Sequence, residues 1–265
     1  MPSKTILVTG CSAGGIGAAV AFALVKRNHH VFATARNTSK IPQSLSDSPN
    51  VTVLQLDVSS PPSIAEAVKI VAESGRGLDV LFNNAGAGYA MPILDIDVQR
   101  AQQVYDTNVW GPIRTIQAFS QLLIASRGRI VNLSTCGAVM NTPWIGAYCS
   151  SKAALTNFSE TLRLELAPFG VSVVTIMAGV VASHFHDNDS FSLPPTSRYV
   201  AIEKTIAGWA SGELKPKGVS AEEFAETLVD DVVGVGSGGG LVWKGPHAGG
   251  VKFLSKWAPS AIATG

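Results

Sequence analysis

Short apolar runs alternate with longer segments whose apolar residues recur at helical spacing, along almost the whole chain. The runs are rich in Val, Ile, Phe and Ala and predict seven strands, at 4–9, 31–35, 51–57, 78–83, 128–134, 171–177 and 240–243. The longer segments predict helices at about 16–28, 61–74, 97–126, 147–167 and 220–233. Because strands and helices alternate, we expect an α/β fold: a doubly wound, parallel, seven-stranded sheet with helices on both faces.

One stretch breaks this alternation. From about 182 to 218 the chain is rich in Ser, Pro, Asp, Asn and His, with a short helix predicted near 198–211. A long connection after the sixth strand of such a sheet is typical of a segment that covers a substrate, so we interpret it as a lid. No linker divides the chain, and we expect residues 1–265 to form a single domain.

The composition is that of a globular protein with strands buried on both faces, since 46% of the residues are hydrophobic and 15% are charged. A net charge of +1 without a long basic run argues against nucleic acid as a partner. Three cysteines without metal-ligand spacing suit a reducing compartment, and the start at Met1 leaves no room for a signal peptide. No apolar stretch could span a bilayer, so we expect a cytoplasmic protein, with peripheral contact to lipid surfaces left open.

A glycine-rich turn joins the first predicted strand to the first helix. Gly10, Gly15 and Gly17 lie in it, with Ile16 between the last two. Glycines let the backbone approach a pyrophosphate, and the N–H groups at a helix N-terminus face its negative charge. The spacing departs from a simple G-x-G-x-x-G, so the prediction of a pyrophosphate site depends on the order of strand, turn and helix. A tight turn that binds nothing is the alternative.

Two charged residues follow the second and third strands, at the edge where an adenosine would lie. Arg36, after the second strand, suits a 2′-phosphate and predicts NADP(H) rather than NAD, with Ser12 as a second contact. A solvated arginine at a strand end is the alternative. Asp57, after the third strand, could reach the adenine, cap the following helix, or do both.

Small and amide-bearing residues follow the fourth strand. Asn84, Ala85 and Gly86 would let the backbone lie against a cofactor ribose, although alone they could form a simple turn. Asn108 interrupts the predicted helix at 97–126, and its amide could bond backbone groups and anchor a water near Lys152. An irregularity of that helix is the alternative.

Tyr148 and Lys152 are four residues apart in a predicted helix, so the phenol and the ammonium would lie side by side. A nearby cation favours the phenolate and is expected to lower the pKa of the tyrosine from about 10. Such a phenol can exchange a proton with a substrate oxygen near neutral pH. Ser134 ends the fifth predicted strand, fourteen residues before the tyrosine.

These motifs together resemble the short-chain dehydrogenase/reductase family, in order and across nearly the whole chain. The resemblance implies a Rossmann fold that binds NADP(H) and reduces a carbonyl group by hydride transfer. It implies that Tyr148 is the general acid, that Lys152 binds the nicotinamide ribose and lowers the tyrosine's pKa, that Ser134 bonds the substrate carbonyl, and that Asn108 holds a relay water. The expected cofactor contacts are Gly10, Ser12, Gly15, Ile16, Gly17, Arg36, Asp57, Asn84, Ala85, Gly86, Tyr148, Lys152, Gly179, Val181 and Ser183.

Two departures from the family pattern concern the cofactor. The glycine turn is one residue longer than usual, and Ala178-Gly179 stands where the family has Pro-Gly. With the run Thr34–Asn37 and the ending Val242–Gly245, they resemble the fungal subgroup of 1-acyldihydroxyacetone-phosphate reductases and secondary-metabolite ketoreductases. This resemblance implies a lipid-like or secondary-metabolite carbonyl substrate and a homodimer or homotetramer.

An alternative function and two further motifs are weighed against this interpretation. An NADPH-binding scaffold, or a pocket serving a non-redox cyclisation or isomerisation, is the alternative function. The run Gly234–Gly240 contains a literal G-x-G-x-x-G, but it follows a helix and precedes a strand, so we interpret it as a flexible turn. His184 and His186 alternate in a polar loop without a third ligand, and we expect no metal there.

Overall fold

Seven parallel strands form one sheet in the order β3-β2-β1-β4-β5-β6-β9 in the computed structural model, which describes residues 2–183, 191–235 and 238–257. Their bounds are β1 Thr5–Val8, β2 His30–Ala35, β3 Val51–Gln55, β4 Val80–Asn83, β5 Arg129–Thr135, β6 Ser172–Ala178 and β9 Gly240–Lys244. The strand order reverses between β1 and β4. An open sheet binds ligands in the crevice outside the carboxyl ends of its strands at this point.

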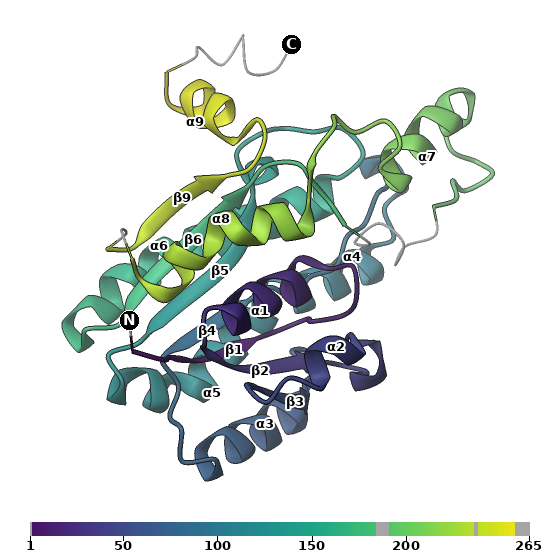
Figure 1. The fold of residues 1–265 in the computed structure, drawn as a ribbon. Helices are drawn as coiled ribbons and strands as arrows, with labels where there is room; N and C mark the ends of the chain where they lie inside the picture. The colour runs from purple at the N-terminus through teal and green to yellow at the C-terminus, as the bar shows by residue number, and fades with distance from the viewer. Residues whose placement is uncertain (1, 184–190, 236–237, 258–265) are drawn as a thin grey trace.

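Helices cover both faces of the sheet, and Figure 1 shows the two layers. α1 Ile16–Lys26 and α8 Ala221–Val233 pack together on one face, whereas α3 Pro61–Glu73, α5 Gly111–Ala125 and α6 Gly146–Leu166 pack on the other. α4 Val98–Tyr105 leads into α5 through a π-helical turn, η3 Asp106–Trp110. The remaining helices are α2 Gln43–Ser46, α7 Glu203–Ser211 and α9 Ala248–Trp257.

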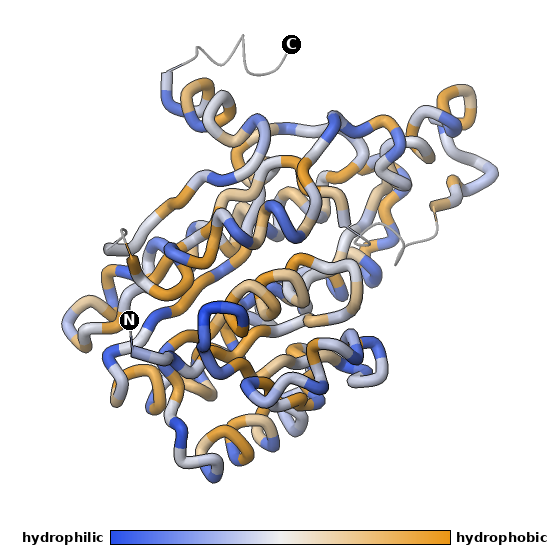
Figure 2. The backbone as a smooth tube through the Cα atoms, viewed as in Figure 1, coloured by the Kyte–Doolittle hydropathy of each residue, from blue (hydrophilic) through white to orange (hydrophobic). Residues whose placement is uncertain are grey.

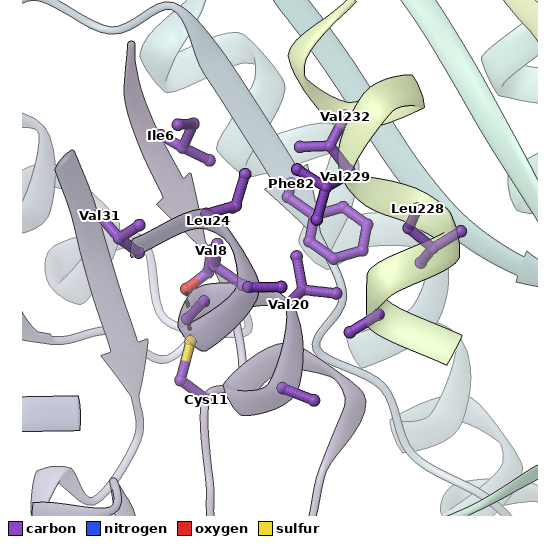
Figure 3. Close-up of a cluster of buried hydrophobic side chains, with 14 of the residues drawn as sticks. Ile6, Val8, Cys11, Val20, Leu24, Val31, Phe82, Leu228, Val229 and Val232 are labelled. Carbon is purple, nitrogen blue, oxygen red and sulfur yellow. Dashed lines mark hydrogen bonds between the residues drawn. The ribbon is translucent and has the colours of Figure 1, made fainter. Parts of the chain in front are cut away.

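Apolar side chains fill the space between the sheet and each helical layer. In Figure 2, the orange colour of hydrophobic residues recurs along the strands in the interior. In Figure 3, Val20 and Leu24 of α1 and Leu228 and Val229 of α8 surround Phe82 of β4. All five side chains are fully buried. Each contributes on the order of 1.5–3 kcal/mol through burial, which fixes both helices against the sheet.

The fold prediction is confirmed: all seven predicted strands form, and the sheet is parallel and doubly wound within a single domain. The predicted helix at 97–126 is interrupted at Asn108, where η3 separates α4 from α5. The short helices α2 and α9 were not predicted, because α2 has one turn and the first turn of α9 contains Gly249 and Gly250. A two-stranded sheet of β7 Val181–Ala182 and β8 Val219–Ser220 was also missed.

The predicted lid lies partly outside the described residues, as do His184 and His186. In its described part, α7 forms where a short helix was predicted, preceded by the 3₁₀ turn Val200–Ile202. No helix among the described residues is long and apolar enough to cross a membrane.

Candidate active site

The carboxyl ends of β1 and β4 are tied together by side chains of the glycine turn and the Asn84 segment. Thr9 Oγ1 accepts hydrogen bonds from the backbone N–H groups of Asn84 and Ala85, both at 3.0 Å. In return, Asn84 Nδ2 donates to the carbonyl oxygens of Thr9 at 2.8 Å and Gly10 at 3.0 Å. These bonds satisfy partly buried backbone groups and hold the two strand ends together in one geometry.

The glycine turn forms a cradle that side chains would fill. Gly10 has a φ of +77°, which disfavours other residues, and a Cβ on Gly17 would lie 2.5 Å from both Gly10 O and Asn84 Nδ2. Gly15 is the N-cap of α1 and, having no side chain, offers no capping bond to the N–H groups of the first turn. This arrangement fits the pyrophosphate of a dinucleotide, which such N–H groups bind.

The edge predicted to hold the adenosine contains Arg36, Ser12 and Asp57. Arg36 directly follows β2 and is exposed, so its guanidinium is accessible to an anionic group. Asp57 accepts a bond from the backbone N–H of Ser59 at 2.9 Å. The interpretation of Asp57 as a helix cap is wrong, because Ser60 is the N-cap of α3.

Asn108 is fully buried and joins the loop after β4 to the start of α6. Its Oδ1 accepts from the backbone N–H of Ala87 at 2.8 Å, and its Nδ2 donates to Ala87 O at 2.8 Å and Ser151 Oγ at 3.0 Å. The π-helical turn directs the amide between the loop after β4 and the start of α6. Single π turns of this kind occur frequently at functional sites. The predicted bonding of this amide to backbone is therefore present.

Lys152 extends from α6 toward the same loop. A Cβ on Gly86 would lie 3.3 Å from Asn108 Oδ1 and 3.6 Å from Lys152 Nζ, so a side chain at this position would press on the Asn108 amide and touch the lysine. The ammonium donates to Leu133 O at 2.8 Å. Burial lowers the pKa of Lys152 to about 8, because desolvation disfavours its charged form.

Tyr148 stands one helical turn before Lys152, as predicted, but its pKa is raised rather than lowered. Burial is the main cause and the Cys149 thiol adds to it, whereas a hydrogen bond from the Thr135 side chain acts in the opposite direction. Desolvation of the phenolate therefore sets the direction of the shift, and the expected lowering of the pKa by the Lys152 ammonium is not among its causes. The phenol remains protonated at neutral pH.

Ser134 does not occupy the position expected for the hydroxyl beside Tyr148. Its side chain is buried, and Oγ lies 2.7 Å from Thr156 Oγ1 and 3.3 Å from the Lys152 carbonyl oxygen. Thr135, the next residue, provides the hydroxyl that bonds Tyr148. Consecutive residues of a strand point to opposite faces of the sheet. The Ser134 hydroxyl is therefore directed to one face and the Thr135 hydroxyl to the other.

The strand boundary was the signal that could have identified Thr135. The prediction ended the fifth strand at residue 134, whereas β5 continues through Thr135, whose register partner on β6 is Ala178. Ligands of an open parallel sheet bind outside the carboxyl ends of its strands, so the last residue of a strand is the one nearest to them. Thr135 occupies that position.

The three predicted cofactor contacts after β6 also have roles in the packing of the fold. A Cβ on Gly179 would lie 1.9 Å from Pro246 O, so a backbone contact requires glycine there whether or not a cofactor approaches. Val181 pairs with Val219 in the two-stranded sheet and packs against the core beside α8. Ser183 follows this sheet as a half-buried bend.

The crevice therefore combines an anion-binding helix terminus, a protonated phenol beside a hydroxyl, and a buried lysine beside a fixed amide. Such a set can bind a dinucleotide and transfer a proton to a substrate oxygen. Among the residues that the structure describes, no His, Cys, Asp and Glu cluster suits a metal ion.

Known proteins resemble this chain in sequence and in fold. Residues 4–191 match the family model for short chain dehydrogenases. The chain is 46% identical over 249 residues to the short-chain dehydrogenase ptmH of Penicillium ochrochloron, covering 94% of this chain and 90% of that protein. It is 35% identical over 261 residues to an NADPH-dependent 1-acyldihydroxyacetone phosphate reductase of Schizosaccharomyces pombe, covering 96% and 85%.

A solved structure shares the fold at lower identity. A short chain dehydrogenase from Burkholderia cenocepacia, crystallised with NADP, superposes with a TM-score of 0.78 at 22% identity, covering 98% of this chain and 95% of that one. The match to the family model and the identity to curated relatives cover most of the chain. The chain therefore belongs to the short-chain dehydrogenase family of oxidoreductases.

Proposed function

We propose that the protein is an NADPH-dependent carbonyl reductase that converts a ketone or an aldehyde to an alcohol. The observation that carries this proposal is the hydrogen bond between the Thr135 hydroxyl and the Tyr148 phenol at the carboxyl edge of the sheet. Two hydroxyl groups held together there can both face one carbonyl oxygen. The relatives named above support the reaction class, since one is named for NADPH-dependent reduction.

The residues that would hold NADP(H) are those that the sequence predicted. Gly10, Gly15 and Gly17 accommodate the pyrophosphate at the N-terminus of α1, and Arg36 pairs with the 2′-phosphate. The remaining predicted contacts follow the crevice from its adenosine edge to its buried end: Ser12, Ile16, Asp57, Asn84, Ala85, Gly86, Tyr148, Lys152, Gly179, Val181 and Ser183. When bound, the cofactor supplies the hydride that reduces the carbonyl carbon.

Tyr148 is the general acid of this proposal. Its raised pKa keeps the phenol protonated at neutral pH, which is the form that donates a proton to a reduced carbonyl oxygen. Thr135, in place of the predicted Ser134, bonds the same oxygen and stabilises the negative charge that develops on it. Because both donors are fixed before the substrate binds, little reorganisation is needed during the reaction.

Lys152 and Asn108 support the acid from the buried side. The Lys152 ammonium, held by Leu133 O, provides the positive charge that binds a ribose hydroxyl and favours proton loss from the phenol. Asn108 fixes the loop at Ala87 with two hydrogen bonds and is the residue we assign to the water that replenishes the proton.

The relatives and the predicted lid support a proposal for the substrate class. We infer a lipid-like or secondary-metabolite carbonyl, since the reductase of Schizosaccharomyces pombe is named for an acylated substrate. The lid at 182–218 would cover it. The three cysteines are free and buried, which suits a cytoplasmic location with a reducing environment.

The decisive experiment compares the protein with a Tyr148→Phe variant. NADPH oxidation across a panel of ketones and aldehydes should fall at least about 10²-fold in the variant, because the proton donor is lost while the ring remains. NADPH binding, followed by cofactor fluorescence, should be unchanged. Full turnover by Tyr148→Phe, or a product formed without transfer of deuterium from deuterated NADPH, would overturn the proposal.

We also infer a homodimer formed through α5 and α6. Trp110 and Phe158 are 47% and 45% exposed, with ring centroids 6.2 Å apart, and Leu164 on α6 is 65% exposed. A groove lined by Ile116, Leu162 and Leu166 runs between the two helices. Light scattering should give the mass of a dimer, and Phe158→Asp should convert it to a monomer.

A further inference from the structure

The helix α9 is apolar on its outward face as well as on its inward face. Ala248 and Val251 are buried and pack against Cys136 and Trp243. The opposite side carries Phe253, Leu254 and Trp257, exposed by 64%, 41% and 75%. A surface helix normally turns polar residues to solvent, so this outward face suits an apolar partner.

The geometry of the helix concentrates these side chains. Phe253 and Trp257 are one turn apart and therefore share a face, nearly opposite the buried Ala248 and Val251. Figure 1 shows α9 at the margin of the fold, beyond β9, and Figure 2 shows apolar and polar positions alternating along it. α9 therefore lies at the edge of the fold, and its exposed aromatic side chains are accessible to a planar surface.

Basic residues flank this apolar face. Lys252 and Lys256 are also one turn apart, and neither forms an ion pair within the described part of the chain. No acidic residue follows Asp231 in the sequence, while three lysines do. Of these, Lys244 is paired with Asp231 at 2.9 Å. The two lysines of α9 therefore give this surface an uncompensated positive charge.

The geometry points to α9 as a docking helix for an anionic phospholipid bilayer. Phe253, Leu254 and Trp257 would enter the boundary between headgroups and acyl chains, where aromatic rings concentrate. Lys252 and Lys256 would contact the anionic headgroups beside them. The positive charge of the helix distinguishes this partner from a neutral apolar protein surface, which the lysines would oppose.

The position of α9 relates this docking to the crevice. The helix packs against the 3₁₀ turn Cys136–Ala138, which directly follows Thr135. Val139 and Met140, next along the chain, are 45% and 41% exposed. Docking would therefore bring the crevice close to the bilayer, from which an apolar carbonyl compound could enter. This last step rests on the proposed function, whereas the docking itself does not.

The experiment measures binding of the full chain to vesicles without any substrate. Co-sedimentation with vesicles of phosphatidylcholine containing about 30% phosphatidylserine should retain the protein, and pure phosphatidylcholine should retain roughly tenfold less. The double variant Lys252→Glu/Lys256→Glu should lose at least about tenfold in binding to the anionic vesicles. Raising the salt concentration from about 0.1 M to about 0.5 M should weaken the wild-type binding in the same direction.

A second pair of variants tests the apolar face. Phe253→Ser/Trp257→Ser should abolish sedimentation, whereas Leu94→Ser/Val98→Ser, which removes residues of similar exposure (74% and 65%) elsewhere, should leave it intact. Brominated acyl chains should quench tryptophan fluorescence in the wild type, and Trp257→Phe should lose that quenching while still binding. Far-ultraviolet circular dichroism verifies that each variant is folded.

Three results would overturn the inference. Equal loss of binding in both serine pairs would indicate unspecific adsorption. Retained binding of Lys252→Glu/Lys256→Glu to the anionic vesicles would show that the two lysines do not contact the headgroups. The third result is that the wild type does not bind vesicles and that light scattering gives a smaller assembly for Phe253→Ser/Trp257→Ser than for the wild type. This result would indicate that α9 is a contact between copies of the chain. Because no result depends on turnover, failure here is distinguishable from failure of the proposed reductase activity.

Discussion

The hydroxyl of Thr135, the last residue of β5, hydrogen-bonds the phenol of Tyr148 at the start of α6. This contact joins the end of the sheet to the helix that carries Lys152. The preceding hydroxyl, that of Ser134, is directed into the protein, where Thr156 is its partner. The two neighbouring hydroxyls therefore have different surroundings, and the difference can be tested.

Thr135→Val removes the hydroxyl while it preserves the shape of the side chain. We expect kcat/KM for carbonyl reduction to fall on the order of 10²-fold, as for the loss of one donor to a developing oxyanion. Thr135→Ser should restore most of the activity. Ser134→Ala should cost about 1 kcal/mol in the free energy of unfolding and leave turnover nearly unchanged. A larger loss of turnover in Ser134→Ala than in Thr135→Val, measured by NADPH oxidation, would return the role to Ser134.

The pH dependence of reduction should report the charge of Lys152. Its pKa of about 8 means that the ammonium is charged below this pH and neutral above it, so kcat/KM should decline as the pH rises through about 8. Tyr148 does not cause this decline, because its pKa is raised. Lys152→Arg keeps a charge throughout this range and should shift the decline to higher pH, even if it is slower overall. An unshifted decline in that variant would assign the titration to another group.

Arg36→Asp tests the recognition of the 2′-phosphate. The variant replaces an attractive charge with a repulsive one, so the KM for NADPH should rise at least about tenfold, while the KM for NADH should change little. Lys26→Asp changes the net charge by the same amount at the C-terminal end of α1, away from the glycine turn, and serves as the control. Equal weakening of NADPH and NADH in Arg36→Asp would mean that this arginine does not distinguish the two cofactors.

Gly17→Ala tests the closeness of the glycine cradle. The new methyl group would lie 2.5 Å from Gly10 O and Asn84 Nδ2, so the turn must shift. We expect a loss of about 1–3 kcal/mol in the free energy of unfolding, measured by urea denaturation, together with weaker NADPH binding. Gly249→Ala is the matched control, because no atom lies within 4 Å of the added group and alanine favours helix formation. Unchanged stability in Gly17→Ala would contradict the packing described for this turn.

Much of the fold was predictable because it depends on local pattern. The seven apolar runs became the seven strands, since a strand buried on both faces must be apolar along its length. Asn108 was recognised as an interruption because an amide at a buried helical position is unusual, and the structure has η3 there. By contrast, α9 was missed, since Gly249 and Gly250 disfavour a helix that tertiary packing of Ala248 and Val251 stabilises.

In the candidate site, too, some features could be predicted from the sequence and others could not. Spacing alone determined that Tyr148 and Lys152 share a helical face and that the glycine turn precedes α1, because both relations are local along the chain. Only the tertiary structure decided that Thr135 rather than Ser134 meets the phenol, since that depends on where β5 ends and which face each side chain takes. The direction of the tyrosine's pKa was likewise decided by burial, which arises from contacts between distant segments and leaves no mark in local spacing.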